Sequence, residues 1–247
     1  MSGAGASGRW PAKAGAAGAP SPLQCFGWSA RAWARPWQQF VRAHPGLRVG
    51  DALELGAGPR SSLAPLLLPL AERVECSVYD DAALPAIEAR HAALLPPTDL
   101  ARLRHSQQDL RALQGRWDLI VMKSVLGGVH RMHDSSLADV HATLARLSEQ
   151  HLRPGGWLLT LDNGRTALEP LLSRLGARRN GWRFFAPGDW PAADWQASFG
   201  VLSAGSAATR LGALGRRIDD ALYLADRALT PLTRQHAVQL HVYRRPA

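Results

Sequence analysis

Residues 49–58 read VGDALELGAG, an apolar strand pattern that runs directly into a glycine turn. A helix is expected to follow from about Ser61. Glycine allows the backbone to turn tightly and lets a ligand approach the main chain closely. A strand, a Gly-x-Gly turn and a helix in this order predict the first unit of an α/β sheet. Taken alone, the turn is also compatible with a purely structural role.

Strands and helices continue to alternate along the chain beyond this turn. We expect strands at 74–79, 103–107, 117–122 and 157–161, and helices at about 82–94, 135–149 and 165–175. Pro69 falls within the helix expected from Ser61, so that helix should be short or kinked. The alternation predicts a doubly wound, mainly parallel sheet in an α/β domain. The carboxyl ends of the parallel strands should then share one edge.

Polar and charged side chains follow each of the predicted strands. They are Glu54, Asp80, Asp109, Lys123-Ser124 and Asp162-Asn163. Ligands of open α/β sheets bind at the edge where the strands end, so these side chains are candidates for one site. Asp80 at the end of the second strand can accept hydrogen bonds from both hydroxyls of a ribose. Asp81 could take the same role, and a solvated strand-end carboxylate is the alternative for both.

Five stretches together resemble the core of class I S-adenosylmethionine-dependent methyltransferases. They are LELGAG at 53–58, Asp80, QDL at 108–110, WDLIV at 117–121 and LRPGGWLL at 152–159. The last stretch is the most specific, because members of the family commonly turn through Leu-x-Pro-Gly-Gly before their fifth strand. The resemblance implies S-adenosylmethionine as the cofactor. It also implies a seven-stranded sheet with an antiparallel C-terminal strand, which the apolar stretches within 195–204 and at 237–243 fit.

The same resemblance implies a set of cofactor-binding residues, which are Glu54, Gly56, Gly58, Asp80, Asp109 and Lys123. The first three would shape the pocket for the amino-acid end of the cofactor. Asp80 would hold the ribose, and Asp109 would reach the adenine amine. The chain departs from the family's Gly-x-Gly-x-Gly at the third glycine, where Arg60 stands.

A nicotinamide-dependent Rossmann oxidoreductase is the competing interpretation of the glycine turn. Its Gly-x-Gly-x-x-Gly motif requires a third glycine at position 61, which is Ser61 here. S-adenosylmethionine brings no phosphate for the turn to hold, so a looser turn suits it. The sequence therefore favours the methyltransferase.

Methyl transfer requires mainly that the acceptor is held in line with an already activated methyl group. A general base helps where the acceptor is a hydroxyl of high pKa. The catalytic candidates are Lys123, His130 and His133, all of which follow the fourth strand, and each could instead be a surface residue. The two histidines have no carboxylate cluster beside them, so we expect no metal site; a metal mechanism through Asp162 is the alternative.

The rest of the chain divides by composition. Residues 1–22 are almost entirely Gly, Ala, Ser and Pro and predict a disordered tail. Residues 23–45 form an aromatic helical segment, either docked on the domain or covering a ligand pocket. Residues 46–247 form the methyltransferase domain, with a helical insertion at about 206–236. The insertion could pack on the domain, form a homodimer surface or cover the substrate; its apolar face is Leu211, Leu214, Ile218, Leu222, Ala225 and Leu229.

The acceptor class follows from charge and from aromatic content. The chain carries 29 basic and 20 acidic residues, a net charge of +9, but all but two of the basic residues are arginines and they form no long run. The residues after the fourth strand read KSVL and lack the Asn/Asp-Pro-Pro-aromatic motif of many nucleic-acid methyltransferases. We therefore expect a small-molecule or glycan-type acceptor in a pocket lined by the tryptophans of 23–45 and 180–195. An RNA methyltransferase and a non-catalytic binding protein are the alternatives.

Two further features bear on the cellular location. The longest apolar run, at 63–71, is far too short to span a membrane. The chain has only two cysteines, Cys25 and Cys76, which predict no disulfide framework. We expect a cytoplasmic protein without a membrane span.

Overall fold

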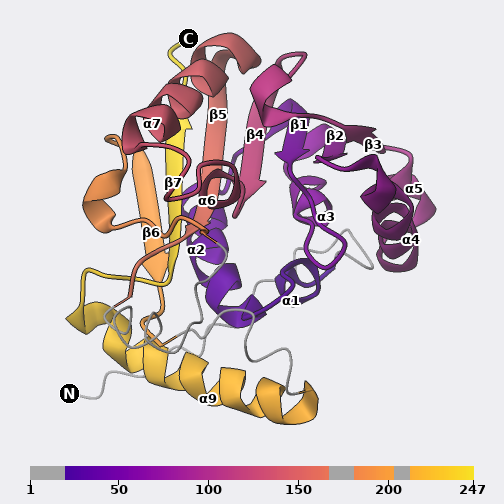
Figure 1. Cartoon of the computed structure of the whole chain (residues 1–247). Helices are drawn as coiled ribbons and strands as arrows, with labels where there is room; N and C mark the ends of the chain where they lie inside the picture. Colours follow the sequence, from indigo (N-terminus) through magenta and orange to yellow (C-terminus); the bar gives the residue numbers. More distant parts are fainter. Residues whose placement is uncertain (1–19, 167–180, 203–211) are drawn as a thin grey trace, which may run out of the picture.

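The computed structural model describes residues 20–166, 181–202 and 212–247. These residues form a seven-stranded sheet in the order β3-β2-β1-β4-β5-β7-β6 (Figure 1). The strands are β1 Val49–Leu55, β2 Ala71–Val78, β3 Leu103–Gln107, β4 Trp117–Lys123, β5 Leu152–Asn163, β6 Trp195–Phe199 and β7 Val238–Arg244. β7 runs antiparallel to both β5 and β6, and the other neighbouring pairs are parallel. The predicted fold class is therefore confirmed.

Helices connect the strands and cover both faces of the sheet. The α-helices are α1 Pro22–Cys25, α2 Ala30–Ala43, α3 Ala64–Leu67, α4 Leu84–Leu94, α5 Pro97–Leu100, α6 Leu126–Val129, α7 Leu137–Arg146 and α9 Gly212–Leu229. Shorter turns of helix are η1 Asp81–Ala83, η2 Leu110–Ala112, the π-turn η3 Leu147–His151, η4 Pro187–Asp189 and η6 Thr230–Leu232. α3 is short, as Pro69 implied. A helix was expected at 165–175. Residues 165 and 166 are not helical, and the rest of that range lies outside the described residues.

β5 begins at Leu152, earlier than the residue 157 expected from the sequence. The Pro-Gly-Gly stretch was expected to be a turn before the strand, but it lies inside it. Gly155 adopts the left-handed backbone, with φ at 75°, and its N–H donates to the carbonyl of Arg245 at 3.1 Å. The chain can therefore bend at this glycine without leaving the sheet.

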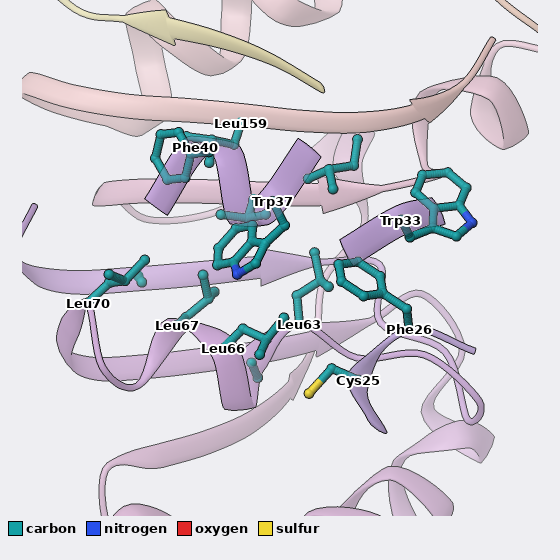
Figure 2. Close-up of a cluster of buried hydrophobic side chains, with 14 of the residues drawn as sticks. Cys25, Phe26, Trp33, Trp37, Phe40, Leu63, Leu66, Leu67, Leu70 and Leu159 are labelled. Carbon is teal, nitrogen blue, oxygen red and sulfur yellow. The ribbon is translucent and has the colours of Figure 1, made fainter. Parts of the chain in front are cut away.

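The aromatic segment near the N-terminus is docked on the sheet. Trp33, Trp37 and Phe40 lie along one side of α2 and are buried, with Leu63 and Leu67 in the same cluster (Figure 2). Their spacing of four and three residues places them on one helical face, as the sequence predicted. Burial of this face holds α2 against the sheet.

The start of this segment differs from the expected boundary of the tail. Ser21 caps α1, since its hydroxyl accepts from the Leu23 N–H at 3.3 Å and Gln24 Oε1 accepts from the Ser21 N–H at 2.8 Å. The ordered chain thus includes the last residues assigned to the tail. Residues 1–19 lie outside the described residues.

α9, part of the predicted insertion, runs across the edge of the sheet toward which β4 points (Figure 1). Its contacts include hydrogen bonds and one aromatic contact: Asp219 accepts from Ser29 Oγ at 2.9 Å, Asp226 accepts from the Val201 N–H at 2.7 Å, and the rings of Tyr223 and Phe199 have centroids 5.4 Å apart. The first half of the expected apolar face is exposed, since Leu214 is 60% exposed and Ile218 is 36% exposed. Hydrogen bonds to Asp219 and Asp226, together with the Tyr223 ring, hold α9 against the domain. Among the described helices, none has the length and apolar character needed to cross a membrane.

A polar cavity of about 600 Å³ lies on the sheet, away from the strand ends. It is lined by residues near the starts of β1 to β4, including Asp51, Arg73, Leu103 and Trp117. The chain passes from β3 to β4 through η2 alone, without a long crossover helix, and this leaves part of the sheet uncovered. None of the candidate site residues lines this cavity.

Candidate active site

The glycine turn folds back from β1 over the end of β2. The N–H groups of Gly56 and Ala57 donate to the Ser77 carbonyl at 3.1 and 2.8 Å. Gly58 and Ser61 exchange backbone hydrogen bonds at 2.9 and 3.0 Å. Gly56 has φ at 81°, a conformation that favours glycine, and a Cβ there would lie 2.6 Å from Val125 Cγ2. The turn therefore requires glycine at this position for both backbone and packing reasons.

This double requirement can be measured by substitution. Gly155 has φ at 75°, but a Cβ there would meet nothing within 4 Å, so it is a matched control. We expect Gly155→Ala to cost about 1–2 kcal/mol of stability through backbone strain alone. Gly56→Ala should cost about 1–3 kcal/mol more because of overpacking against Val125. Urea denaturation measures both values, and equal losses in the two variants would contradict this account.

Glu54, at the end of β1, is buried beneath the turn. Its carboxylate accepts from Ser62 Oγ at 2.6 Å and from the N–H groups of Leu63 and Ala64 at 2.6 and 2.7 Å. Burial raises the pKa of this carboxyl, and these hydrogen bonds oppose the rise. Glu54 thus links the end of β1 to the start of α3 by hydrogen bonds. It also places a buried ionisable group next to the glycine turn.

Two carboxylates lie just beyond the ends of β2 and β3, on the same side of β1. Asp80 follows β2, is exposed and accepts from the Ala82 N–H at 3.1 Å. Asp109 follows β3, is partly buried and accepts from the Arg111 N–H at 2.9 Å. Both side chains act as caps of short helical turns, which fixes them at the edge of the sheet. Their roles toward the ribose and the adenine of the cofactor stay predictions.

Lys123 ends β4 inside a cage of two tryptophans. Its Nζ lies 4.0 Å from the ring centroid of Trp28 and 4.2 Å from that of Trp33. Burial lowers the pKa of Lys123 to about 7, although the negative charges of Glu54 and Asp162 oppose the shift. Aromatic rings at this distance stabilise an ammonium group, so the cage favours the charged form of Lys123 and opposes the effect of burial. The sequence singled out Lys123 but not its contacts with the two tryptophans.

Asp162, at the end of β5, is a second buried ionisable group. It accepts a short hydrogen bond from Thr160 Oγ1 and a 3.3 Å bond from the Gly127 N–H. Burial raises the pKa of Asp162 well above its ordinary value. The neighbouring Asn163 donates to Ser124 Oγ at 3.2 Å, so the ends of β4 and β5 are joined by side chains. The described residues contain no group of three His, Cys, Asp or Glu side chains that could hold a metal ion.

The two histidines proposed as bases lie differently from Lys123. His130 Nε2 is 2.9 Å from Thr143 Oγ1 of α7, and His133 is exposed. Arg183 fixes this loop, donating from Nε to the His130 carbonyl at 2.8 Å and from Nη2 to the Ser135 carbonyl. Their role as bases remains a prediction, and Lys123 is the better candidate because it alone of the three is buried beside other ionisable groups.

Three aromatic residues of 181–195 pack in the core or against α2, and the role of this segment as a pocket wall stays a prediction. Phe185 and Trp190 are buried in the core, with ring centroids 4.4 Å apart. Trp195 packs against Phe40 of α2 at 5.9 Å. Trp182 covers the Gly127-Gly128 pair, where a side chain on either glycine would collide with its indole. Sequence composition could not separate these roles, because aromatic residues serve cores and pockets equally well.

Comparison with known proteins places this geometry in a known fold. No protein-family model and no curated sequence matches the chain. The N-methyltransferase NodS from Bradyrhizobium japonicum WM9, solved with S-adenosylhomocysteine, superposes with a TM-score of 0.51 at 14% identity, covering 89% of this chain and 88% of that chain. The chain has the class I methyltransferase fold.

A second structure with this class I methyltransferase fold acts on a different acceptor. Geranyl diphosphate C-methyltransferase from Streptomyces coelicolor A3(2) superposes with a TM-score of 0.53 at 13% identity, covering 85% of this chain and 78% of that chain. That structure contains magnesium, geranyl diphosphate and S-adenosylhomocysteine. At these identities the fold is shared, and the chemistry has to be argued from the side chains of this chain.

Proposed function

We propose that the chain is an S-adenosylmethionine-dependent methyltransferase that moves a methyl group to a hydroxyl or amine of a small-molecule or glycan-type acceptor. The observation that carries the proposal is the buried Lys123 in its tryptophan cage at the edge of the sheet. A lysine whose pKa lies near 7 can act as a base at physiological pH. It stands beside the glycine turn of a fold whose strand ends are the usual ligand edge.

The residues at the strand ends fit the cofactor. Asp80 offers an exposed carboxylate to the ribose hydroxyls, and Asp109 offers a carboxylate on the next strand to the adenine amine. Gly58 leaves the turn open to close approach by the amino-acid end, because a Cβ there would meet only the Ser61 carbonyl oxygen at 3.9 Å. Gly56 shapes the turn, and Glu54 lies below it. When bound, the cofactor supplies an activated methyl group on a sulfonium.

Lys123 would hold the proton that the acceptor releases. In its neutral form Nζ has a lone pair that can accept a proton from a hydroxyl or ammonium group of the acceptor. The ammonium that forms is stabilised by the faces of Trp28 and Trp33 and by the negative charges of Glu54 and Asp162. α9 and the segment before α2 lie across this edge and would exclude water from it (Figure 1).

Several finer features belong to the same proposal. The protein would work in the cytoplasm, in keeping with its two unpaired, buried cysteines. A homodimer through α9 would bury the exposed Leu214 and Ile218. We do not expect nucleic acid as the acceptor.

Removal of the Asp80 carboxylate tests the cofactor site. We expect Asp80→Ala to weaken S-adenosylhomocysteine binding by about 1–3 kcal/mol, because hydrogen bonds to a charged group are lost. Calorimetric titration measures the change. Asp81→Ala is the control, since Asp81 is exposed at the adjacent position and outside the cap. A loss in Asp81→Ala with no loss in Asp80→Ala would reassign the ribose ligand.

A further inference from the structure

A line of hydrogen bonds leads from the buried Glu54 toward the surface through two adjacent histidines, His91 and His105. Ser62 Oγ lies 2.6 Å from Glu54 Oε2, His91 Nε2 lies 3.0 Å from Ser62 Oγ, and His105 Nε2 lies 2.8 Å from His91 Nδ1. The two imidazole rings lie edge to edge, with centroids 5.1 Å apart and planes inclined by 27°. His105 Nδ1 faces Glu88 Oε1 at 4.0 Å, and the Glu88 side chain is 55% exposed.

The members of this line come from separate parts of the fold and differ in their access to water. Glu54 ends β1, Ser62 precedes α3, His91 lies on α4 and His105 lies on β3. The first three are buried, whereas the His105 side chain is 13% exposed. Buried polar groups are costly unless they are paired, and here each has a partner on both sides. The line of hydrogen bonds therefore joins Glu54, which has no contact with solvent, to His105, which is partly exposed.

We propose that Ser62, His91 and His105 form a proton path between Glu54 and solvent, through which Glu54 releases a proton when Lys123 takes one up. The path itself follows from the hydrogen bonds. The link to Lys123 rests on the proposed function.

Proton transfer along the path can be followed bond by bond. With Glu54 ionised, Ser62 O–H donates to Glu54, His91 Nε2–H donates to Ser62, and His105 Nε2–H donates to His91 Nδ1. When a proton binds to His105 Nδ1, one hydrogen moves along each bond toward Glu54. Afterwards Glu54 carries a proton and both rings carry their hydrogen on Nδ1. One proton has entered, one has arrived, and every intermediate group is neutral again; the reverse sequence releases the proton.

Both rings have to be neutral for such transfer, since only a neutral imidazole has a bare nitrogen. Burial lowers the pKa of His91 to about 4 and also lowers the pKa of His105. Burial raises the pKa of Glu54, so this carboxyl can take up a proton under milder conditions than an exposed glutamate. Glu54, His91 and His105 also face other titratable or charged groups. These are Cys25, Cys76, Glu88, Arg90 and Lys123.

The proton path would keep the net charge of the buried site constant during the reaction. Glu54 and Lys123 end the neighbouring strands β1 and β4 and interact electrostatically. A positive charge on Lys123 favours the ionised form of Glu54. If Lys123 gains the acceptor's proton while Glu54 loses its own to solvent, the net charge of the buried site does not change. The site then avoids the cost of one more buried charge.

Histidine tautomers provide the test. Nitrogen-15 NMR of histidine-labelled, ligand-free protein distinguishes Nδ1–H from Nε2–H rings, and the His91→Asn and His105→Asn variants assign the signals. Carbon-13 labelling reports the titration of Glu54 in the same samples. We expect both rings to switch from Nε2–H to Nδ1–H as the pH falls, together and at the pH where Glu54 takes up its proton. Rings that keep one tautomer wherever the protein is folded, or that switch at different pH values, would overturn the proposal.

Two variants separate a proton path from simple packing. Ser62→Ala cuts the path, and Glu54→Gln removes the group that takes up the proton, so neither variant should show the paired switch. A switch that persists in a folded Glu54→Gln protein would overturn the proposal. Binding of S-adenosylhomocysteine to the wild type is measured separately. Binding without a switch contradicts the path alone, whereas a switch without binding contradicts the proposed function alone.

Discussion

Lys123→Met is expected to lower the rate of methyl transfer by about 10²–10⁴-fold, the usual contribution of a general base. Methionine keeps most of the apolar stem between Trp28 and Trp33 but has no titratable nitrogen. Affinity for S-adenosylhomocysteine should change little, because a group that acts in the transition state affects the rate more than ground-state binding. Single-turnover kinetics and calorimetry measure the two quantities once an acceptor is in hand.

Lys13, the other lysine of the sequence, gives a matched control. Lys13→Met makes the same chemical change in the predicted tail, and we expect it to leave both the rate and the affinity unchanged. If Lys123→Met retained the full rate, Lys123 would not be the base, and His130 and His133 would be tested next. A loss of affinity equal to the loss of rate would instead make Lys123 a binding residue.

The pH dependence of the wild-type rate should reflect the same group. Because burial lowers the pKa of Lys123 to about 7, its neutral form is scarce below that pH and predominates above it. The rate should therefore rise with pH up to about 7 and then level off.

The stability of the protein also depends on the pKa of Lys123, and it can be measured without an acceptor. An unfolded lysine holds its proton up to pH 10.5, so between about 7 and 10.5 the unfolded state binds more protons and stability rises with pH in the wild type. Lys123→Met should lack this rise.

Phe40→Ala is expected to cost about 3–5 kcal/mol of unfolding free energy, as removal of a fully buried aromatic ring usually does. Phe40 is completely buried on α2, and its ring contacts those of Trp37, Trp157 and Trp195 at 5.8, 6.4 and 5.9 Å. No smaller side chain can bridge the helix and the two strands in the same way. Urea denaturation measures the loss.

A surface leucine shows whether the loss reflects burial. Leu232 is 79% exposed, so Leu232→Ala should stay within about 0.5 kcal/mol of the wild type. α2 also carries Trp33, so Phe40→Ala should loosen the cage around Lys123 and raise its pKa toward that of an exposed lysine. Equal stability of the wild type and Phe40→Ala would mean that α2 is not docked as described.

The sheet was predictable because each of its strands has a local signal. Residues 119–122 are apolar throughout, as a strand buried on both faces requires, and the glycine turn after β1 marks the start of the crossover. The start of β5 was missed because Pro-Gly-Gly is typical of turns. Hydrogen bonds of Gly155 and Gly156 with the C-terminal segment, which is remote in sequence, keep this stretch in the sheet.

The candidate site was predictable only in part. Strand ends placed Lys123, Glu54 and Asp162 at one edge, because parallel strands share that edge whatever their side chains. The contacts of Lys123 with Trp28 and Trp33 were not predictable, since they depend on how α2 docks. The same holds for the pairing of His91 with His105, whose positions on α4 and β3 meet only in the folded chain.

Side-by-side titration of the wild-type protein with S-adenosylhomocysteine and with NAD tests the central claim most directly. The two ligands share an adenosine, so the comparison isolates what the glycine turn accepts beyond the ribose: an amino-acid chain or a pyrophosphate. The account predicts saturable binding of S-adenosylhomocysteine at one site per chain and no saturable binding of NAD. Tight binding of NAD with none of S-adenosylhomocysteine would contradict it.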